Sequence, residues 1–243
     1  SPDVGAHHDY WRLGIGDRNT TLAGMVATLC TLALEFSPGT RWNYSVATDV
    51  IGHLIERISG QRLDAFLRDE IFAPLGMKDT GFHVPSDRLE RFATNYTRMP
   101  DKSVRIEDDP AASPYATPPA FFSGGGGLVS TASDYLSFCQ MLLNQGELAG
   151  RRILGRKTIE LMTENHLPGG QDIAALNVGG QFSQVTYVGV GFGLGFSVTL
   201  DPARAQVVGS PGEYAWGGAA STAFWIDPAE ELIVIFMTQF MPS

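Results

Sequence analysis

Apolar residues recur at helical spacing in several parts of the chain. Over residues 46–58 they occupy the i, i+3 and i+4 positions of one face, which includes Ile51, Leu54 and Ile58. This spacing predicts an amphipathic helix with that face buried. Gly60 follows it, where helices commonly end on a left-handed residue. Comparable patterns predict further helices over 20–34, 63–71, 131–146 and 156–165.

The hydrophobic period changes near residue 189. Later runs rich in β-branched and aromatic residues cover 191–200, 221–226 and 232–237. Asp-Pro pairs that begin at Asp201 and Asp227 supply turn signals, so we predict an antiparallel meander. We therefore expect an α+β chain, with a mainly helical region and cleft loops over 1–180 and sheet strands over 181–243.

Composition narrows the classes of function. The chain has 243 residues and a net charge of −9. It carries no basic run or stripe that would attract nucleic acid or an anionic membrane surface. Its longest apolar segment, 232–237, is too short to span a bilayer. Cys30 and Cys139 both have apolar neighbours, so we expect two buried free thiols. These features do not determine the cellular compartment.

The first residues carry no initiator methionine and no signal peptide, so we expect the chain to begin inside a longer protein. The adjacent histidines His7 and His8 precede Asp9 on a predicted loop. No H-x-H or H-E-x-x-H partner appears elsewhere, so a substrate-cleft loop is a better interpretation than a metal site. We predict no metal and no cofactor.

Four consecutive glycines follow Ser123. A glycine loop before a helix can hold a phosphate, but the pattern G-x-x-x-x-G-K is absent. We therefore predict a structural role, in which the missing side chains let two backbone segments pack closely.

Two short motifs point to a known class of enzyme. Tyr44-Ser45-Val46 follows a rigid Ser-Pro-Gly turn, and Trp216-Gly217-Gly218 lies near the C-terminal strands. With segment 71–80, they resemble the serine hydrolases of the β-lactamase and penicillin-binding-protein type. The nearest resemblance is to the family VIII carboxylesterases, which are similar to class C β-lactamases. It covers nearly the whole chain and implies a β-lactamase/transpeptidase-like fold whose N-terminal strands and last helix this chain lacks.

The resemblance implies a catalytic role for Tyr44. In the family this tyrosine works with a lysine to move protons to and from the nucleophilic serine. A free phenol, with a pKa of about 10, is a poor base at neutral pH, but a neighbouring ammonium favours the phenolate. Without the resemblance, a packed core aromatic is the simpler interpretation of Tyr44.

The second motif, Trp216-Gly217-Gly218, matches the W-G-G of family VIII esterases at the strand where lactamases carry K-T-G. The resemblance implies that the glycines let a substrate lie against the strand edge. The backbone N–H of Ala219 would then join that of the serine as an oxyanion hole. A bulge that packs a tryptophan is the alternative interpretation.

The nucleophile itself is absent from the sequence. No G-x-S-x-G occurs, and none of the lysines, at positions 78, 102 and 157, has a serine three residues earlier. The chain therefore has no S-x-x-K. We expect the serine and lysine to come from a segment before Ser1 or from a companion chain, and this polypeptide alone to be inactive.

Two departures from the lactamase pattern favour an ester substrate. Val46 replaces the asparagine of Y-x-N, which removes an amide that can hydrogen-bond a β-lactam side chain. Trp216 replaces the lysine of K-T-G, which removes a cation that can pair with a carboxylate. We predict a serine carboxylesterase acting on short-chain or small aromatic esters. The alternatives are a β-lactamase, D,D-peptidase or acyltransferase of the same fold, and a non-catalytic binding module.

Overall fold

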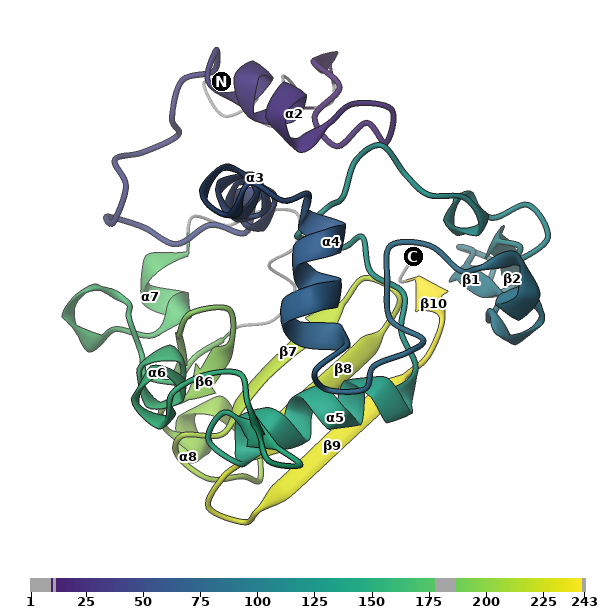
Figure 1. Cartoon of the computed structure of the whole chain (residues 1–243). Coiled ribbons are helices and arrows are strands. Elements are labelled where there is room, and N and C mark those ends of the chain that lie inside the picture. Colours follow the sequence, from purple (N-terminus) through teal and green to yellow (C-terminus); the bar gives the residue numbers. More distant parts are fainter. Residues whose placement is uncertain (1–9, 11, 178–186, 242–243) are drawn as a thin grey trace.

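The predicted α+β architecture is confirmed by the computed structural model, which describes residues 10, 12–177 and 187–241. Its central feature is an antiparallel sheet with the strand order β5-β6-β7-β8-β9 (Figure 1). The strands are β5 (Val190–Phe192), β6 (Ser197–Thr199), β7 (Tyr214–Gly218), β8 (Thr222–Asp227) and β9 (Leu232–Met237). Each strand pairs with the next one along the chain, so the predicted meander is correct. The predicted run 191–200, however, divides into two antiparallel strands, β5 and β6.

The helices precede the sheet or connect its parts. They are α2 (Leu22–Leu29), α3 (Ala47–Ser59), α4 (Leu63–Leu67), α5 (Ala132–Leu143), α6 (Arg156–Met162), α7 (Ile173–Leu176) and α8 (Pro202–Ala205). A π-helical turn, η2 (Arg68–Phe72), continues α4 directly. Short 3₁₀ turns are η3 (Ser86–Arg91), η4 (Pro114–Ala116) and η5 (Pro168–Gly170), and β3 (Glu147–Leu148) pairs with β4 (Arg151–Arg152).

Helix α5 packs along the sheet and forms much of the main core (Figure 1). Its N-cap, Thr131, accepts a hydrogen bond from the Asp134 amide at 3.2 Å, as Ser and Thr caps commonly do. Met141 and Leu142 of α5 lie in one buried cluster with Tyr214 and Ile226 of the sheet. The main core therefore draws on both the helical region and the strand region.

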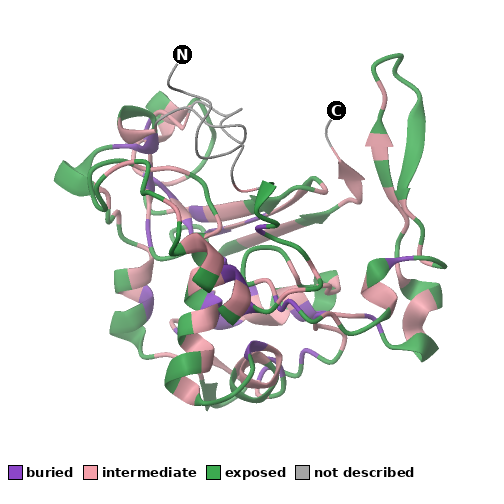
Figure 2. Cartoon of the chain, turned by 90° about the horizontal axis from the view of Figure 1, so that it is seen from above, coloured by how far each residue is buried: buried purple, intermediate pink, exposed green. Residues whose placement is uncertain are grey.

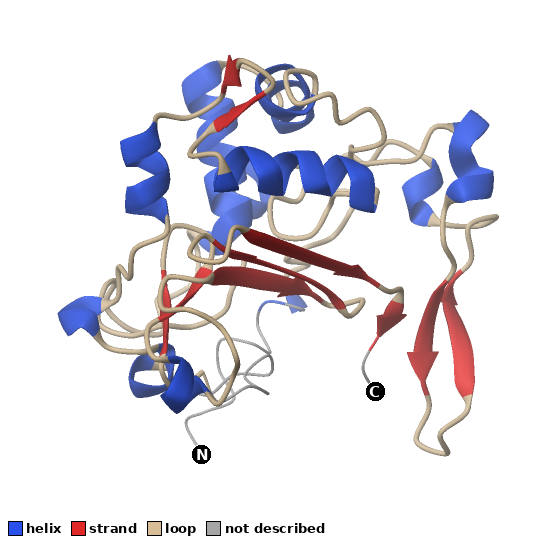
Figure 3. Cartoon of the chain, turned by 90° about the horizontal axis from the view of Figure 1, so that it is seen from below, coloured by secondary structure: helices blue, strands red, loops and turns tan. Residues whose placement is uncertain are grey.

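A separate hairpin projects from the main body. It consists of β1 (Asn95–Arg98) and β2 (Val104–Asp108), and β1 also pairs in parallel with β10 (Phe240–Met241). Figure 3 shows the hairpin standing apart from the main sheet, and Figure 2 shows that most of its surface is exposed. The segment after residue 100 thus contributes a strand to this exposed hairpin.

Helix α3 has the predicted extent, but the predicted buried face is wrong in part. Ile51, Leu54 and Ile58 are 53%, 50% and 85% exposed, whereas Asp49 and Gly52 are buried. Gly52 faces the neighbouring helices: a Cβ there would lie 2.9 Å from Leu63 Cδ2. Leu22 of α2 and Leu63 of α4 pack on this small-residue face. Val46 and Ile55 of the predicted face also pack against that cluster, so the apolar spacing identified part of the buried face.

The two cysteines differ in exposure. Cys139 is 0% exposed within α5, and burial raises the pKa of its thiol to about 12. Cys30 is exposed, so the expectation that both thiols are buried is wrong for Cys30. The reason is that α2 ends at Leu29, earlier than predicted, and leaves Cys30 on the surface just beyond it.

We expect only one thiol of the native protein to react quickly with Ellman's reagent. The thiolate is the reactive species, so the buried Cys139, with its raised pKa, should react only after unfolding. Absorbance at neutral pH, with and without denaturant, measures this directly. A Cys30→Ser variant is the control and should lose the fast reaction. Fast reaction of two thiols without denaturant would contradict the packing of α5.

No helix in the described part of the chain has the length and apolar character needed to cross a membrane.

Candidate active site

Tyr44 lies on the last loop residues before α3. The Ser45 hydroxyl accepts a hydrogen bond from the Ala47 amide at 3.2 Å, which satisfies one of the free donors of the first helical turn. The Tyr44 side chain is 38% exposed. It therefore lies at the N-terminal end of α3 with its ring accessible. Tyr44 is not a buried core aromatic.

The glycine run holds the first turn of α3 in place. The buried Asp49 carboxylate accepts hydrogen bonds from the Ser123 hydroxyl at 2.6 Å and the Gly125 amide at 3.2 Å. At Gly124 a Cβ would lie 2.5 Å from the Thr48 carbonyl oxygen, closer than real Cβ atoms come. Glycine is thus required for close backbone packing here, as predicted. The contact fixes the helix that follows Tyr44.

Trp216, Gly217 and Gly218 form the end of β7. Gly218 pairs with Thr222 of β8, and a Cβ on Gly218 would lie 2.4 Å from the Thr222 hydroxyl. This glycine therefore has a packing role in the hairpin. Gly217, Gly218 and Ala219 are all exposed, and the Ala219 N–H has no acceptor among the described residues. An accessible strand edge with a free amide donor is consistent with the predicted oxyanion role.

The tertiary structure brings the two motifs together. The rings of Tyr44 and Trp216 stack with centroids 6.0 Å apart and planes inclined by 10°. Trp216 also contacts the edge of Phe192 of β5 at 5.3 Å, and Phe192 contacts Trp42 at 5.6 Å. Stacked and edge-to-face arrangements are the favourable ones for aromatic rings. Tyr44 thus stacks on the residue that directly precedes the two glycines of β7.

Sequence reasoning missed two residues of this site. Phe192 was included only in a strand, although it packs between Trp42 and Trp216. Tyr187 has a positive φ of 45°, and burial, followed by the proximity of Tyr44, raises its pKa. A positive φ in a bulky residue is uncommon and is found at functional sites. No sequence motif marks either residue, because their relation to Tyr44 arises only from folding.

Val46 occupies a different environment from the other predicted site residues. It is the N-terminal boundary residue of α3 and packs, partly buried, against the second core cluster, which includes Leu22 and Leu63. Its contribution to substrate binding stays a prediction.

No group of three or more potential metal ligands lies close together in the part of the chain that the structure describes. His7, His8 and Asp9 lie outside the described residues.

Comparison with known proteins identifies the family. The model of the Beta-lactamase family matches residues 4–243. Protein Rv1367c of Mycobacterium tuberculosis (strain ATCC 25618 / H37Rv) is 39% identical over 90% of this chain and 53% of its own length. Esterase EstB of Burkholderia gladioli is 32% identical over 96% of this chain and 59% of its own length.

A solved structure of a related enzyme has a fold similar to that of this chain. The structure of "EstCE1, a hydrolase with promiscuous acyltransferase activity" superposes with a TM-score of 0.78 at 27% identity, over 96% of this chain and 61% of that one. The chain thus spans between about half and three fifths of the length of these proteins. The β-lactamase/transpeptidase-like fold implied by the sequence motifs is confirmed.

Proposed function

This chain belongs to the Beta-lactamase family, and from that premise we propose that it carries part of the active site of a serine carboxylesterase. The proposed enzyme hydrolyses short-chain or small aromatic esters through an acyl-enzyme intermediate. Its nucleophilic serine and the partnering lysine come from outside this chain, in a preceding segment or a companion chain. Tyr44 and the strand edge at Trp216 supply the other half of the site.

The observation that carries this proposal is the stack of Tyr44 on Trp216, with ring centroids 6.0 Å apart. Residues 44 and 216 are far apart in the sequence, yet their side chains meet beside the exposed glycines of β7. Pockets that bind small ligands combine apolar and aromatic walls with a few well-placed polar groups. Tyr44 O–H and Ala219 N–H are such groups, and the indole of Trp216 is such a wall.

The proposed chemistry assigns one proton path and one charge-binding site. The serine oxygen attacks the ester carbonyl carbon, while Tyr44 together with the lysine accepts the serine proton and passes it to the departing alkoxide. The Ala219 N–H stabilises the oxyanion that forms on the carbonyl oxygen. Water then attacks the acyl-enzyme by the same route in reverse, which releases the carboxylic acid and restores the serine.

Trp216 supports an ester over a β-lactam substrate. Its ring contacts those of Tyr44 and Phe192, and an indole offers one N–H and a broad apolar face. Such a surface favours a neutral acyl or alcohol group over a carboxylate. EstB and EstCE1, named as an esterase and a hydrolase, support the same choice.

Relative turnover of two chromogenic substrates tests the proposal. An enzyme that contains the serine and lysine should hydrolyse p-nitrophenyl butyrate with a higher kcat/KM than nitrocefin, and this 243-residue chain by itself should hydrolyse neither. Higher kcat/KM for nitrocefin would favour a β-lactamase. Turnover by the chain alone would show that its nucleophile lies within these residues.

Acyl transfer is a second candidate function, because the name of EstCE1 includes a promiscuous acyltransferase activity. An acyl-enzyme can pass its acyl group to an alcohol instead of water. Adding a primary alcohol during p-nitrophenyl butyrate turnover should reveal a new ester by mass spectrometry if the site accepts alcohols. Formation of the acid alone would leave hydrolysis as the reaction.

A further inference from the structure

A pocket lies away from the candidate active site. Its volume is about 360 Å³, and its walls come from α4 and η2, from the segment 78–92 and from the segment 118–131. Neither Tyr44 nor any residue of β7 lines it. The pocket therefore has its own chemistry, which the proposed esterase reaction does not use.

The floor of this pocket is apolar and firmly packed. Phe72, Phe82, Val84 and Phe122 line it, and all four are buried. The rings of Phe82 and Phe122 meet edge to face with centroids 5.1 Å apart. A preformed apolar floor of this size fits one phenyl ring or short alkyl chain, within the usual range of small-ligand pockets.

The rim of the pocket is cationic. The basic residues that line it are Arg62, Arg68, Lys78, Arg88 and Arg91, whereas the acidic ones are Asp64 and Asp79. The surplus of positive charge is local, because the chain as a whole carries a net charge of −9. A cluster of one sign in a concave site focuses the electrostatic potential there.

The ion pairs leave part of this positive charge uncompensated. Arg62 binds both oxygens of Asp64, at 2.9 and 2.6 Å, so these two charges cancel. Arg88 and Arg91 share the single carboxylate of Asp79, at 2.6 and 2.8 Å, and the nearby carboxylates of Asp134 and Glu90 also act on Arg91.

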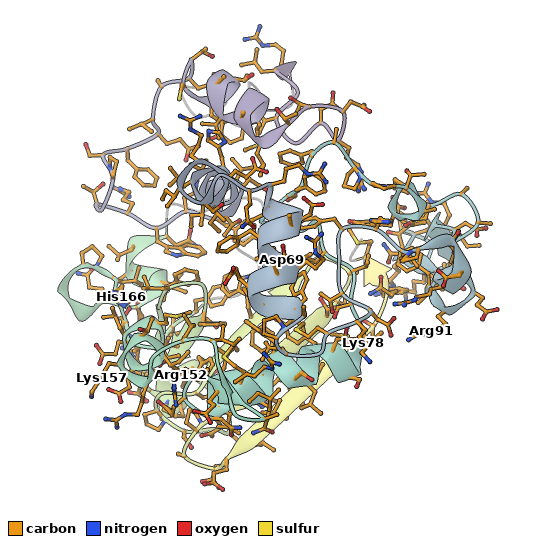
Figure 4. The ribbon with its side chains drawn as sticks, viewed as in Figure 1. Asp69, Lys78, Arg91, Arg152, Lys157 and His166 are labelled. Atoms are coloured by element: carbon orange, nitrogen blue, oxygen red, sulfur yellow. The ribbon has the colours of Figure 1, made fainter. Side chains whose placement is uncertain are left out.

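Lys78 supplies the positive charge of the rim that has no paired carboxylate in the described part of the chain. No carboxylate lies within 4.0 Å of its ammonium among the residues that the structure describes. Figure 4 shows Lys78 and Arg91 on the same side of the molecule, away from Arg152 and Lys157, and both line the pocket. Arg68, the remaining lining cation, is paired with Asp69 at 2.8 Å.

Two of the hydroxyl groups in the wall are already engaged. The Thr80 hydroxyl donates its proton to the buried Asp134 carboxylate at 2.9 Å. Because a hydroxyl has one proton, the Ser130 hydroxyl is the donor in its 2.8 Å hydrogen bond to the Thr80 hydroxyl. The cations of the rim remain to recognise a polar ligand atom, together with His83 and the Thr131 hydroxyl in the wall.

We propose that this pocket binds a small amphipathic carboxylate, with its apolar group on the phenylalanine floor and its carboxylate beside Lys78 and the Arg88–Arg91 pair. The combination of a buried aromatic floor and an undercompensated cationic rim selects such a ligand. A neutral molecule would gain only the apolar contact. A cationic ligand would be repelled by the same rim.

Isothermal titration calorimetry of the purified protein with 4-phenylbutanoate tests the proposal, with 4-phenylbutan-1-ol as the uncharged control ligand. We expect the acid to bind more tightly than the alcohol, and its affinity to fall as salt is added, because the rim is solvent-exposed. Reversing the charge with Lys78→Glu should weaken acid binding about tenfold, since an attraction becomes a repulsion.

The matched control is Lys157→Glu, which makes the same charge change on the exposed side of α6, far from the pocket. It should leave the affinity for the acid unchanged, and circular dichroism should show that both variants are folded. Trp216→Ala separates this pocket from the candidate active site. The proposal is overturned if the acid does not bind at millimolar concentration, if Lys78→Glu binds normally, or if Trp216→Ala weakens binding and Lys78→Glu does not.

Discussion

Replacing Tyr44 with phenylalanine is expected to lower kcat for ester hydrolysis by about a hundredfold or more, which is the scale of general acid–base catalysis. The change removes only the hydroxyl that is proposed to carry the proton. The ring that stacks on Trp216 stays, so KM and the stability of the fold should change little. Steady-state kinetics with p-nitrophenyl butyrate, on an enzyme that contains the serine and lysine, measures the effect.

The chain offers a matched control for this variant. Tyr96 of the projecting hairpin is 39% exposed, almost the same as Tyr44 at 38%, but it lies in a different sheet from the candidate site. Tyr96→Phe should therefore leave kcat and KM unchanged. An enzyme with Tyr44→Phe that works normally would remove Tyr44 from the mechanism, and the esterase proposal would lose its proton carrier.

Replacing Gly146 with alanine is expected to lower the free energy of unfolding by about 3 kcal/mol or more. Gly146 follows the C-cap region of α5 and has a φ of +93°, a conformation that costs other residues about 1–2 kcal/mol. A Cβ there would also lie 2.2 Å from the Leu154 carbonyl oxygen. The backbone at Leu154 cannot yield easily, because Gly146 O accepts hydrogen bonds from the Ile153 and Leu154 amides.

Gly150 separates the cost of conformation from the cost of the clash. It lies in the β3–β4 connection with a φ of +76°, and a Cβ there would meet nothing within 4 Å. Gly150→Ala should thus lose only about 1–2 kcal/mol. Urea unfolding followed by circular dichroism compares the two variants. Equal losses would show that the backbone near Leu154 moves away without cost, contrary to the packing described.

Local patterns predicted the elements whose stability depends on local interactions. The apolar spacing and Gly60 predicted helix α3, and Gly60 has the left-handed φ of +71° expected of a helix end. Which face of a helix is buried depends on its neighbours, and the exposed Ile51, Leu54 and Ile58 show that spacing does not supply this information.

The same distinction between local sequence and tertiary packing holds for the candidate site. The sequence by itself determined which residues are proposed to carry the chemistry, because Tyr44-Ser45-Val46 and Trp216-Gly217-Gly218 are short motifs whose residue types suit proton transfer and close substrate approach. Only the tertiary structure decided that the Tyr44 and Trp216 rings stack, and that Phe192 packs on the same indole. The physical reason is that these contacts join segments far apart in the chain, and their geometry is set by the packing of α3 and the sheet rather than by any local sequence.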